Sequence, residues 1–398
     1  MMCFQRNSWR TLSGIFFVAG TAIGAGMLGL PFVTAQPGFF PGVLVTLSVW
    51  ILMCCTAIFL LEVSLWFPKG ANLVSISTKL LGRGGGWFVG MMFIFLYYCL
   101  MVAYFAAGSS LLFQVIFPKF LSSPIWQSCL LFGLVFGFIV YAGPKWIDRV
   151  NILTSILMMA CWLLLTGLGI KYLRPTRLIE TEWNRTFVAI PVFFSAFGFH
   201  NLIPSLTTYL HRNRKVLYQT IFWGSAIPLV VYILWQGLVI GTLSRSELLH
   251  AVQQQVPVVD LLQAITKNSC FLIFGRFFSL FAIVTSTLGV SLSMVDFLGD
   301  SLHCLKRTGW TRLMLCLLTF VPPGILAVIY PGIFIKALSI AGGFGEAFLN
   351  ALLPILLLCL GKYRSRYPLQ RQWLYSPAVL GFFALFAIFT MMLEVYLL

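Results

Sequence analysis

Two glycine- and proline-rich segments interrupt apolar stretches of the sequence and carry the residues best suited to bind a small polar ligand. The first, GTAIGAGMLGLPF, covers residues 20–32, and the second, IPVFFSAFGFHNLIPSL, covers residues 190–206. A membrane helix that opens at such a segment leaves backbone amides and carbonyls without partners, and protein, water or a ligand must satisfy them. We therefore expect both segments to face a binding site.

The first segment can bind a carboxylate with its backbone. A half-helix that begins after Gly24 and Gly26 points its partly positive amide end into the space left by the break. Glycine there relieves the restriction on φ and lets a ligand approach the backbone. The spacing of Gly20 and Gly24 also suits close packing of two helices. The pattern GAGMLG matches a dinucleotide motif as well, but no strand precedes it and the next acidic residue is Glu62, too far for that use.

The second segment adds aromatic walls and a few polar side chains. Four Phe residues lie between positions 193 and 199, beside Ser195, His200 and Asn201. This mixture suits an apolar or aromatic side chain attached to a zwitterion, although Phe is abundant throughout the chain and also packs against lipid. An ionisable residue in mid-membrane is functional by default. His200 is therefore a candidate for proton coupling, with a hydrogen-bonded structural histidine as the alternative.

Two later apolar stretches also carry polar side chains. Ser286 and Thr287 belong to the hydroxyl-rich run IVTSTLGVSLSMVDF, which could bind a cation or form hydrogen bonds between helices. Glu346 follows the glycine-rich run SIAGGFG and is the second candidate for proton coupling, unless it neutralises a basic partner.

The composition requires a lipid bilayer around this chain. Of its 398 residues, 60% are hydrophobic and 9% are charged, against about 25% charged residues in a soluble domain. Stretches of about 20 mostly apolar residues can cross a membrane. The sequence therefore predicts an all-α integral membrane protein, one transmembrane domain over residues 1–398. Its eleven predicted spans are 12–33, 40–66, 86–117, 125–143, 150–171, 187–209, 217–242, 271–298, 311–330, 333–360 and 377–398.

The two interrupted segments occupy corresponding places if the spans form two halves. Each would be the first span of a half, with one repeat at about 12–171, a second at about 187–360 and an extra helix at about 377–398. Five spans per half invert the second half relative to the first. Matched interruptions in inverted halves indicate the central site of a secondary transporter.

The charges and the remaining motifs narrow the function. The net charge is +16; with the N-terminus inside, inner segments carry 17 Lys and Arg and outer segments 9. This predicts a cytoplasmic N-terminus and a periplasmic C-terminus, and no nucleic-acid partner. Scattered cysteines predict no metal site, and no enzyme motif is visible. A channel would need a continuous polar lining, whereas the polar residues here cluster at the two interrupted segments. The segment 243–270 predicts short amphipathic helices over the outer face, where they could form a lid.

The two interrupted segments and the eleven spans resemble the hydroxy and aromatic amino acid permease family, most closely its tyrosine-specific bacterial members. The resemblance covers essentially the whole chain, and its specificity rests on the two interruptions. It implies a leucine-transporter-like fold with five-plus-five inverted repeats and one extra helix. It also implies import of tyrosine or another aromatic amino acid across the bacterial inner membrane by proton symport. Tryptophan or serine and threonine as substrates, and sodium as the coupling ion, remain alternatives.

The resemblance also assigns residues. It implies that the backbone of the first segment holds the carboxylate and amine of the substrate, that the second segment covers its side chain, and that two hydroxyls lie where sodium-coupled relatives place cation ligands. No other cofactor and no obligate protein partner are expected. The substrate residues are Ala22, Ile23, Gly24, Ala25, Gly26, Phe194, Ser195, Phe197, Gly198, Phe199, His200 and Asn201, and the cation residues are Ser286 and Thr287.

Overall fold

The computed structural model describes residues 2–117, 124–254, 256–302, 304, 308–365, 367 and 375–398, and this part of the chain contains helices and no strands. The first helices are α1 (Met2–Ala22), α2 (Ala25–Thr34), α3 (Phe39–Trp66), α4 (Leu73–Ile116), α5 (Ile125–Ala142) and α6 (Pro144–Gly169). The middle of the chain forms α7 (Pro175–Ile179), α8 (Ile190–Ala196), α9 (Ile203–Tyr209), α10 (Arg214–Thr242), α11 (Arg245–Gln254) and α12 (Val258–Thr266). The last helices are α13 (Ser269–Ser301), α14 (Gly309–Ile329), α15 (Phe334–Ile340), the π-helix η4 (Ala341–Leu352), α16 (Leu353–Tyr363) and α17 (Pro377–Leu397).

Short 3₁₀ segments join several of these helices. They are η1 (Ile170–Tyr172), η2 (Trp183–Ala189) and η3 (His200–Leu202). Two of them belong to the interrupted sixth span: η2 begins it, and η3 lies inside it between α8 and α9. Together η2, α8, η3 and α9 form one membrane-length segment from Trp183 to Tyr209.

The predicted number of spans is confirmed in the described residues. Ten helical segments are long and apolar enough to cross a membrane, and α1 with α2 makes an eleventh, bent by 54° at its break. The third span is formed by α4, which begins earlier than the predicted bounds of 86–117. Asn72 starts it at Leu73 by accepting a hydrogen bond from the Ser75 amide (2.8 Å), and Gly82 interrupts it with a left-handed φ of 81°.

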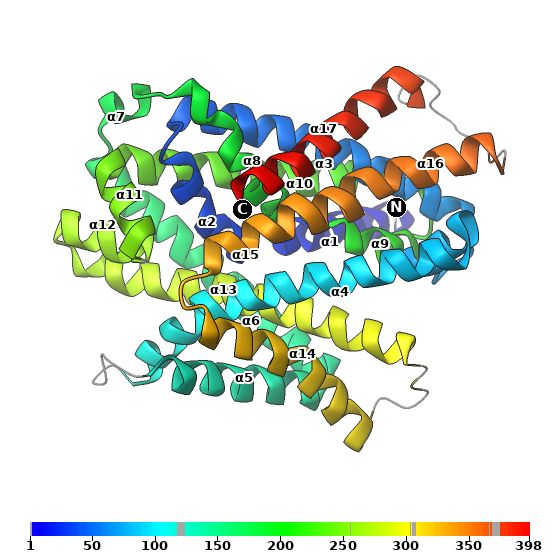
Figure 1. Cartoon of the computed structure of the whole chain (residues 1–398), viewed down its shortest axis with the longest axis horizontal. Helices are drawn as coiled ribbons and strands as arrows, with labels where there is room; N and C mark the ends of the chain where they lie inside the picture. The colour runs from blue at the N-terminus through cyan, green and yellow to red at the C-terminus, as the bar shows by residue number, and fades with distance from the viewer. Residues whose placement is uncertain are drawn as a thin grey trace.

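The long helices run in similar directions, and the short helices α2 and α8 lie in the middle of the bundle (Figure 1). α1 packs along α10, and α13 packs against α6 and α4. α11 and α12 lie together at one end (Figure 1), which confirms that the segment 243–270 forms short helices, as predicted. The two-repeat division at 12–171 and 187–360 stays a prediction.

Candidate functional site

The first break lies between Ala22, where α1 ends, and Ala25, where α2 begins. The Ala25 amide donates a hydrogen bond to the hydroxyl oxygen of Ser286 (2.9 Å) on α13. Gly24 has φ −161°, an extended conformation open to any residue, so the predicted need for glycine on account of φ is wrong. Glycine leaves space here instead, because a Cβ at this position would displace the Ser286 hydroxyl that accepts from the Ala25 amide.

The second break lies between Ala196, the last residue of α8, and the short segment η3. Gly198 is in this break, where its backbone faces the Glu346 carboxyl group. Ser195, one residue before the end of α8, donates its hydroxyl proton to the Leu338 carbonyl oxygen of α15 (2.6 Å). The side chain of Ser195, predicted to bind substrate, thus forms a hydrogen bond to a neighbouring helix.

The two breaks are in direct backbone contact. A Cβ added to Gly26 would lie 2.9 Å from the Cα of Ala196 and 3.3 Å from its Cβ. The predicted meeting of the two segments is therefore observed, and the small residues at both breaks make it possible.

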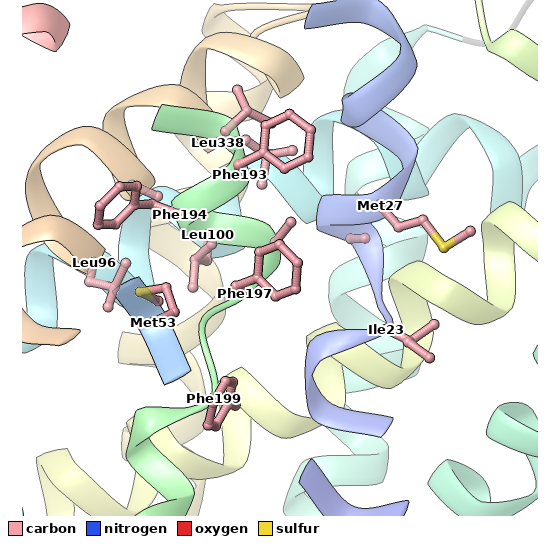
Figure 2. Packing of buried hydrophobic residues seen from close by; sticks show 14 of the residues in the cluster. Ile23, Met27, Met53, Leu96, Leu100, Phe193, Phe194, Phe197, Phe199 and Leu338 are labelled. Atoms are coloured by element: carbon pink, nitrogen blue, oxygen red, sulfur yellow. The ribbon is translucent and has the colours of Figure 1, made fainter. Parts of the chain in front are cut away.

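The four Phe residues of the second segment are completely buried, and their rings point in different directions (Figure 2). Figure 2 shows Phe197 on the side of α8 that faces Ile23 and Met27, whereas Phe194 lies on the other side. Phe194 stacks on Phe386 of α17, with ring centroids 6.3 Å apart. The structure thus brings Phe197 to the first break and directs Phe194 toward the extra helix.

His200 and Asn201 follow the second break. His200 is 1% exposed; its Nε2 atom lies 3.0 Å from the Thr56 hydroxyl of α3, and its ring stacks on Phe199. Such a setting suits the hydrogen-bonded histidine that was the alternative to a proton carrier. Asn201 is exposed and donates from its amide nitrogen to the Tyr97 hydroxyl (3.4 Å).

Glu346 reaches the second break from the π-helix η4. Its side chain is 4% exposed and accepts a hydrogen bond from the Asn350 amide one turn later. A Cβ on Gly198 would lie 2.8 Å from the Glu346 carboxyl carbon. π-Helical turns occur often at functional sites, and this one places a buried carboxyl group against an unwound part of the backbone.

The two hydroxyls proposed as cation ligands have different surroundings. Ser286 reaches the first break through the Ala25 amide. Thr287 is buried and donates to the Ile283 carbonyl of its own helix (2.7 Å). Of this pair, the structure brings Ser286 to the break by a hydrogen bond.

Two further polar contacts involve arginine residues outside the two breaks. Arg10 of α1 contacts His211, beside a cavity of about 230 Å³ lined also by Leu210, Asn213 and Val216. Elsewhere, Arg245 at the start of α11 forms an ion pair with Glu182. The hydrogen bond and charge of Arg245 hold the pKa of the exposed Glu182 carboxyl below its ordinary value.

Sequence reasoning missed Tyr232 of α10, the side chain that contacts both breaks. Its hydroxyl oxygen lies within hydrogen-bond distance of the carbonyl oxygens of Ala22 (2.5 Å) and Ala196 (2.7 Å). A single tyrosine in the run VVYILWQG has the periodicity of any core aromatic residue. The one available signal was a hydroxyl-bearing residue in the middle of an apolar span, whose buried OH needs a partner.

Comparisons with known proteins match nearly the whole chain. The family model described as tryptophan/tyrosine permease family matches residues 7–397. Tyrosine-specific transport system 1 of Haemophilus influenzae is 33% identical over 354 residues, covering 88% of each chain. The tryptophan-specific transport protein of the same organism is 31% identical over 412 residues, covering 98% of this chain and 97% of its own.

The fold also has a solved counterpart. The crystal structure of MhsT in complex with L-phenylalanine superposes with a TM-score of 0.66, covering 96% of this chain and 97% of MhsT at 16% sequence identity. At this identity the match concerns the fold alone. It confirms the expected leucine-transporter-like architecture.

Proposed function

Because the chain belongs to the tryptophan/tyrosine permease family, we propose that it imports tyrosine or tryptophan by proton symport, with access alternating around the two breaks. The matched family and fold support amino acid transport, and the membrane-length helices of the described residues fit a multi-pass inner-membrane protein. The choice of an aromatic substrate, the coupling ion and the role of each residue are the parts we propose.

The observation that carries this proposal is the direct contact between the two breaks. At Gly26 and Ala196 the ends of three half-helices come together: the amide end of α2 and the carbonyl ends of α1 and α8. Amide ends favour a carboxylate and carbonyl ends favour an ammonium group. An amino acid carries both charges close together, so opposite helix ends in one place suit its zwitterionic part.

The surroundings of the second break favour an aromatic side chain. Phe197 and Phe199 are buried on either side of Gly198, and they provide flat apolar surfaces for a ring. The polar groups of Asn201 and Tyr97 lie next to them. Two of the relatives are named for tyrosine and tryptophan transport, which supports this choice over serine or threonine.

Glu346 is our first candidate for the proton carrier. Its carboxyl group is buried against Gly198, and an ionised carboxylate at such a place is costly. Binding a proton removes this charge, so that the backbone at Gly198 faces a neutral carboxylic acid instead of a carboxylate. His200 remains the second candidate, because it lies in the same segment and is equally buried.

Uptake into proteoliposomes tests substrate and ion together. Purified protein is reconstituted, and labelled tyrosine, tryptophan and serine are offered with an imposed proton gradient, an imposed sodium gradient or neither. We expect accumulation of tyrosine or tryptophan only with the proton gradient, abolished by a protonophore. Accumulation driven by sodium alone would show that sodium is the coupling ion. Accumulation of serine alone would refute the proposal of an aromatic substrate.

Sodium is the second candidate ion because Ser286 lies at the first break. In that case, sodium would bind among hydroxyl and carbonyl oxygens, which are its preferred ligands in membrane sites. Under this alternative, Ser286→Ala raises the sodium concentration needed for half-maximal uptake. Under proton coupling, the same variant leaves uptake independent of sodium.

We also propose that the N-terminus is cytoplasmic and the C-terminus periplasmic. The charge count behind this orientation includes Arg6, Lys306, Arg307, Arg366 and Arg371, whose side chains lie outside the described residues. Cys270 is exposed at the start of α13 and would face the periplasm. A membrane-impermeant thiol reagent should label it in intact right-side-out vesicles. Labelling only after permeabilisation would indicate the opposite orientation.

A further inference from the structure

Tyr232 lies near the middle of α10, and its hydroxyl group joins the two breaks. The residue is completely buried. Its hydroxyl oxygen is 2.5 Å from the carbonyl oxygen of Ala22 and 2.7 Å from that of Ala196. These are the last residues of α1 and α8. One side chain therefore contacts the ends of two other helices where each is interrupted.

These carbonyl groups need a donor from outside their own helices. The last carbonyls of a helix have no partner within it, and they carry the partial negative charge of the helix dipole. Two such groups buried close together repel each other and lose their hydration. A phenol has one proton to donate, so the hydroxyl of Tyr232 is shared between the two oxygens or alternates between them. Without it, both carbonyls would be left facing each other.

The position of the Tyr232 hydroxyl is set by one contact of its ring and by the packing of α10. The Phe197 ring packs edge-on against it, with centroids 5.0 Å apart. One turn later, Gln236 donates to the Tyr232 carbonyl (3.1 Å) and to the Thr46 hydroxyl of α3 (3.2 Å). α10 also packs closely along α1, where a Cβ on Gly224 would lie 2.6 Å from the Val18 Cβ. The hydroxyl position is thus defined relative to α1, α3 and α8.

We propose that Tyr232 is a positioning residue that sets the register between the two breaks, and with it the spacing of the groups that bind the two ends of the amino acid. This inference rests on the proposed function. The first break is held from both sides, at the Ala22 carbonyl by Tyr232 and at the Ala25 amide by Ser286. Because the hydroxyl has a single proton, it can donate fully to only one of the two carbonyls at a time. In alternating access, loss of the bond to Ala22 would free the end of α1 while the bond to Ala196 is kept.

The variant Tyr232→Phe tests this role, with Tyr98→Phe as the matched control. Tyr98 also donates to a backbone carbonyl, that of Leu318 on α14 (2.8 Å), but away from the breaks. We expect Tyr232→Phe to raise the KM for labelled tyrosine or tryptophan about ten-fold or more in proteoliposomes, the effect of losing one buried hydrogen bond. Tyr98→Phe should leave KM unchanged. The maximal rate and the yield of monodisperse protein are measured beside KM, because a purely structural defect lowers the yield and the rate without shifting KM.

Equal KM values for the two variants would overturn the role of Tyr232. If the wild type itself transports no aromatic amino acid, the proposed function fails instead, so the two failures are distinguishable. If Tyr232→Phe yields no folded protein, mono- and difluorotyrosine are incorporated at position 232. They keep the hydroxyl and grade its strength as a donor. A KM that follows the donor strength supports the proposal, and a KM that stays constant across this series refutes it.

Discussion

The carboxyl group of Glu346 lies directly against the backbone of Gly198, 148 positions earlier in the chain. A side chain at Gly198 would displace the Glu346 carboxyl group, since an added Cβ would come within 2.8 Å of the carboxyl carbon. A buried acid of the π-helix and the unwound part of the sixth span therefore form one unit. A proton on Glu346 changes the charge next to the break without any change in the chain's connectivity.

Gly198→Ala should reduce uptake about ten-fold, because overpacking of this kind costs about 1–3 kcal/mol. Gly198 does not have a left-handed φ, so the effect arises from the collision with Glu346. The measurement is initial uptake per folded transporter. Gly167→Ala, where a Cβ meets nothing within 4 Å, is the control and should behave as wild type. Normal uptake by Gly198→Ala would show that the contact yields freely.

Glu346→Gln should uncouple transport from the proton gradient. The amide is neutral at every pH and nearly the same size, so exchange of labelled for unlabelled substrate should persist while accumulation driven by the gradient is lost. Glu394→Gln is the control, because Glu394 is a second buried acid, hydrogen-bonded to Ser339 on the side of the extra helix α17. Gradient-driven accumulation that survives in Glu346→Gln would remove Glu346 as the carrier and leave His200.

Gly26→Ala should abolish substrate binding while the protein still inserts into the membrane. The added methyl group would lie 2.9 Å from the Ala196 backbone and push the two breaks apart. Gly20→Ala changes the same residue type in the same span, at a site where a Cβ meets nothing within 4 Å. Binding of labelled tyrosine or tryptophan is measured on both purified variants and should be lost only in Gly26→Ala. Equal binding by the two variants would contradict a substrate site at the contact of the breaks.

Ser286→Ala should weaken the first break by removing the acceptor for the Ala25 amide, at a cost of about 1–3 kcal/mol for a buried group left unpaired. Ser291→Ala is the matched control on the same helix, because that hydroxyl donates to the Leu288 carbonyl of α13 itself (3.3 Å). Thermal unfolding in detergent should place the Ser286 variant below the control. A melting temperature equal to the control would mean that water replaces the hydroxyl.

The ion pair between Arg245 and Glu182 should give a small pH dependence to the attachment of α11. The arginine lowers the pKa of the Glu182 carboxyl, so the pair stabilises the folded state above the ordinary carboxyl pKa of 4.5 and loses this effect as the pH falls through the lowered value. The effect stays small because the pair is solvent-exposed. Proteolysis between α10 and α12 should increase at pH 3.5 relative to pH 6, and Glu182→Gln should remove the difference. If the proteolysis rate depends on pH equally in wild type and Glu182→Gln, the pH dependence comes from other groups.

Local sequence was enough to predict the spans and the places where two of them open. Crossing a bilayer needs only a run of apolar residues, and helix interruption follows from Gly and Pro at the break itself. The meeting of Gly26 with Ala196 could be anticipated because the two breaks hold equivalent places in the chain. The reason why position 24 is a glycine could not be anticipated, because the atom that a side chain would meet belongs to Ser286, more than 250 positions away.

The sequence by itself determined that this protein is a helical membrane transporter with two broken spans, because hydropathy and backbone chemistry act on neighbouring residues. Only the tertiary structure decided which side chains reach the breaks. It turned Phe194 toward α17, placed Glu346 on Gly198 and brought the Tyr232 hydroxyl between two helix ends. Those outcomes depend on the rotation of each helix about its axis, which is set by packing against all of its neighbours at once.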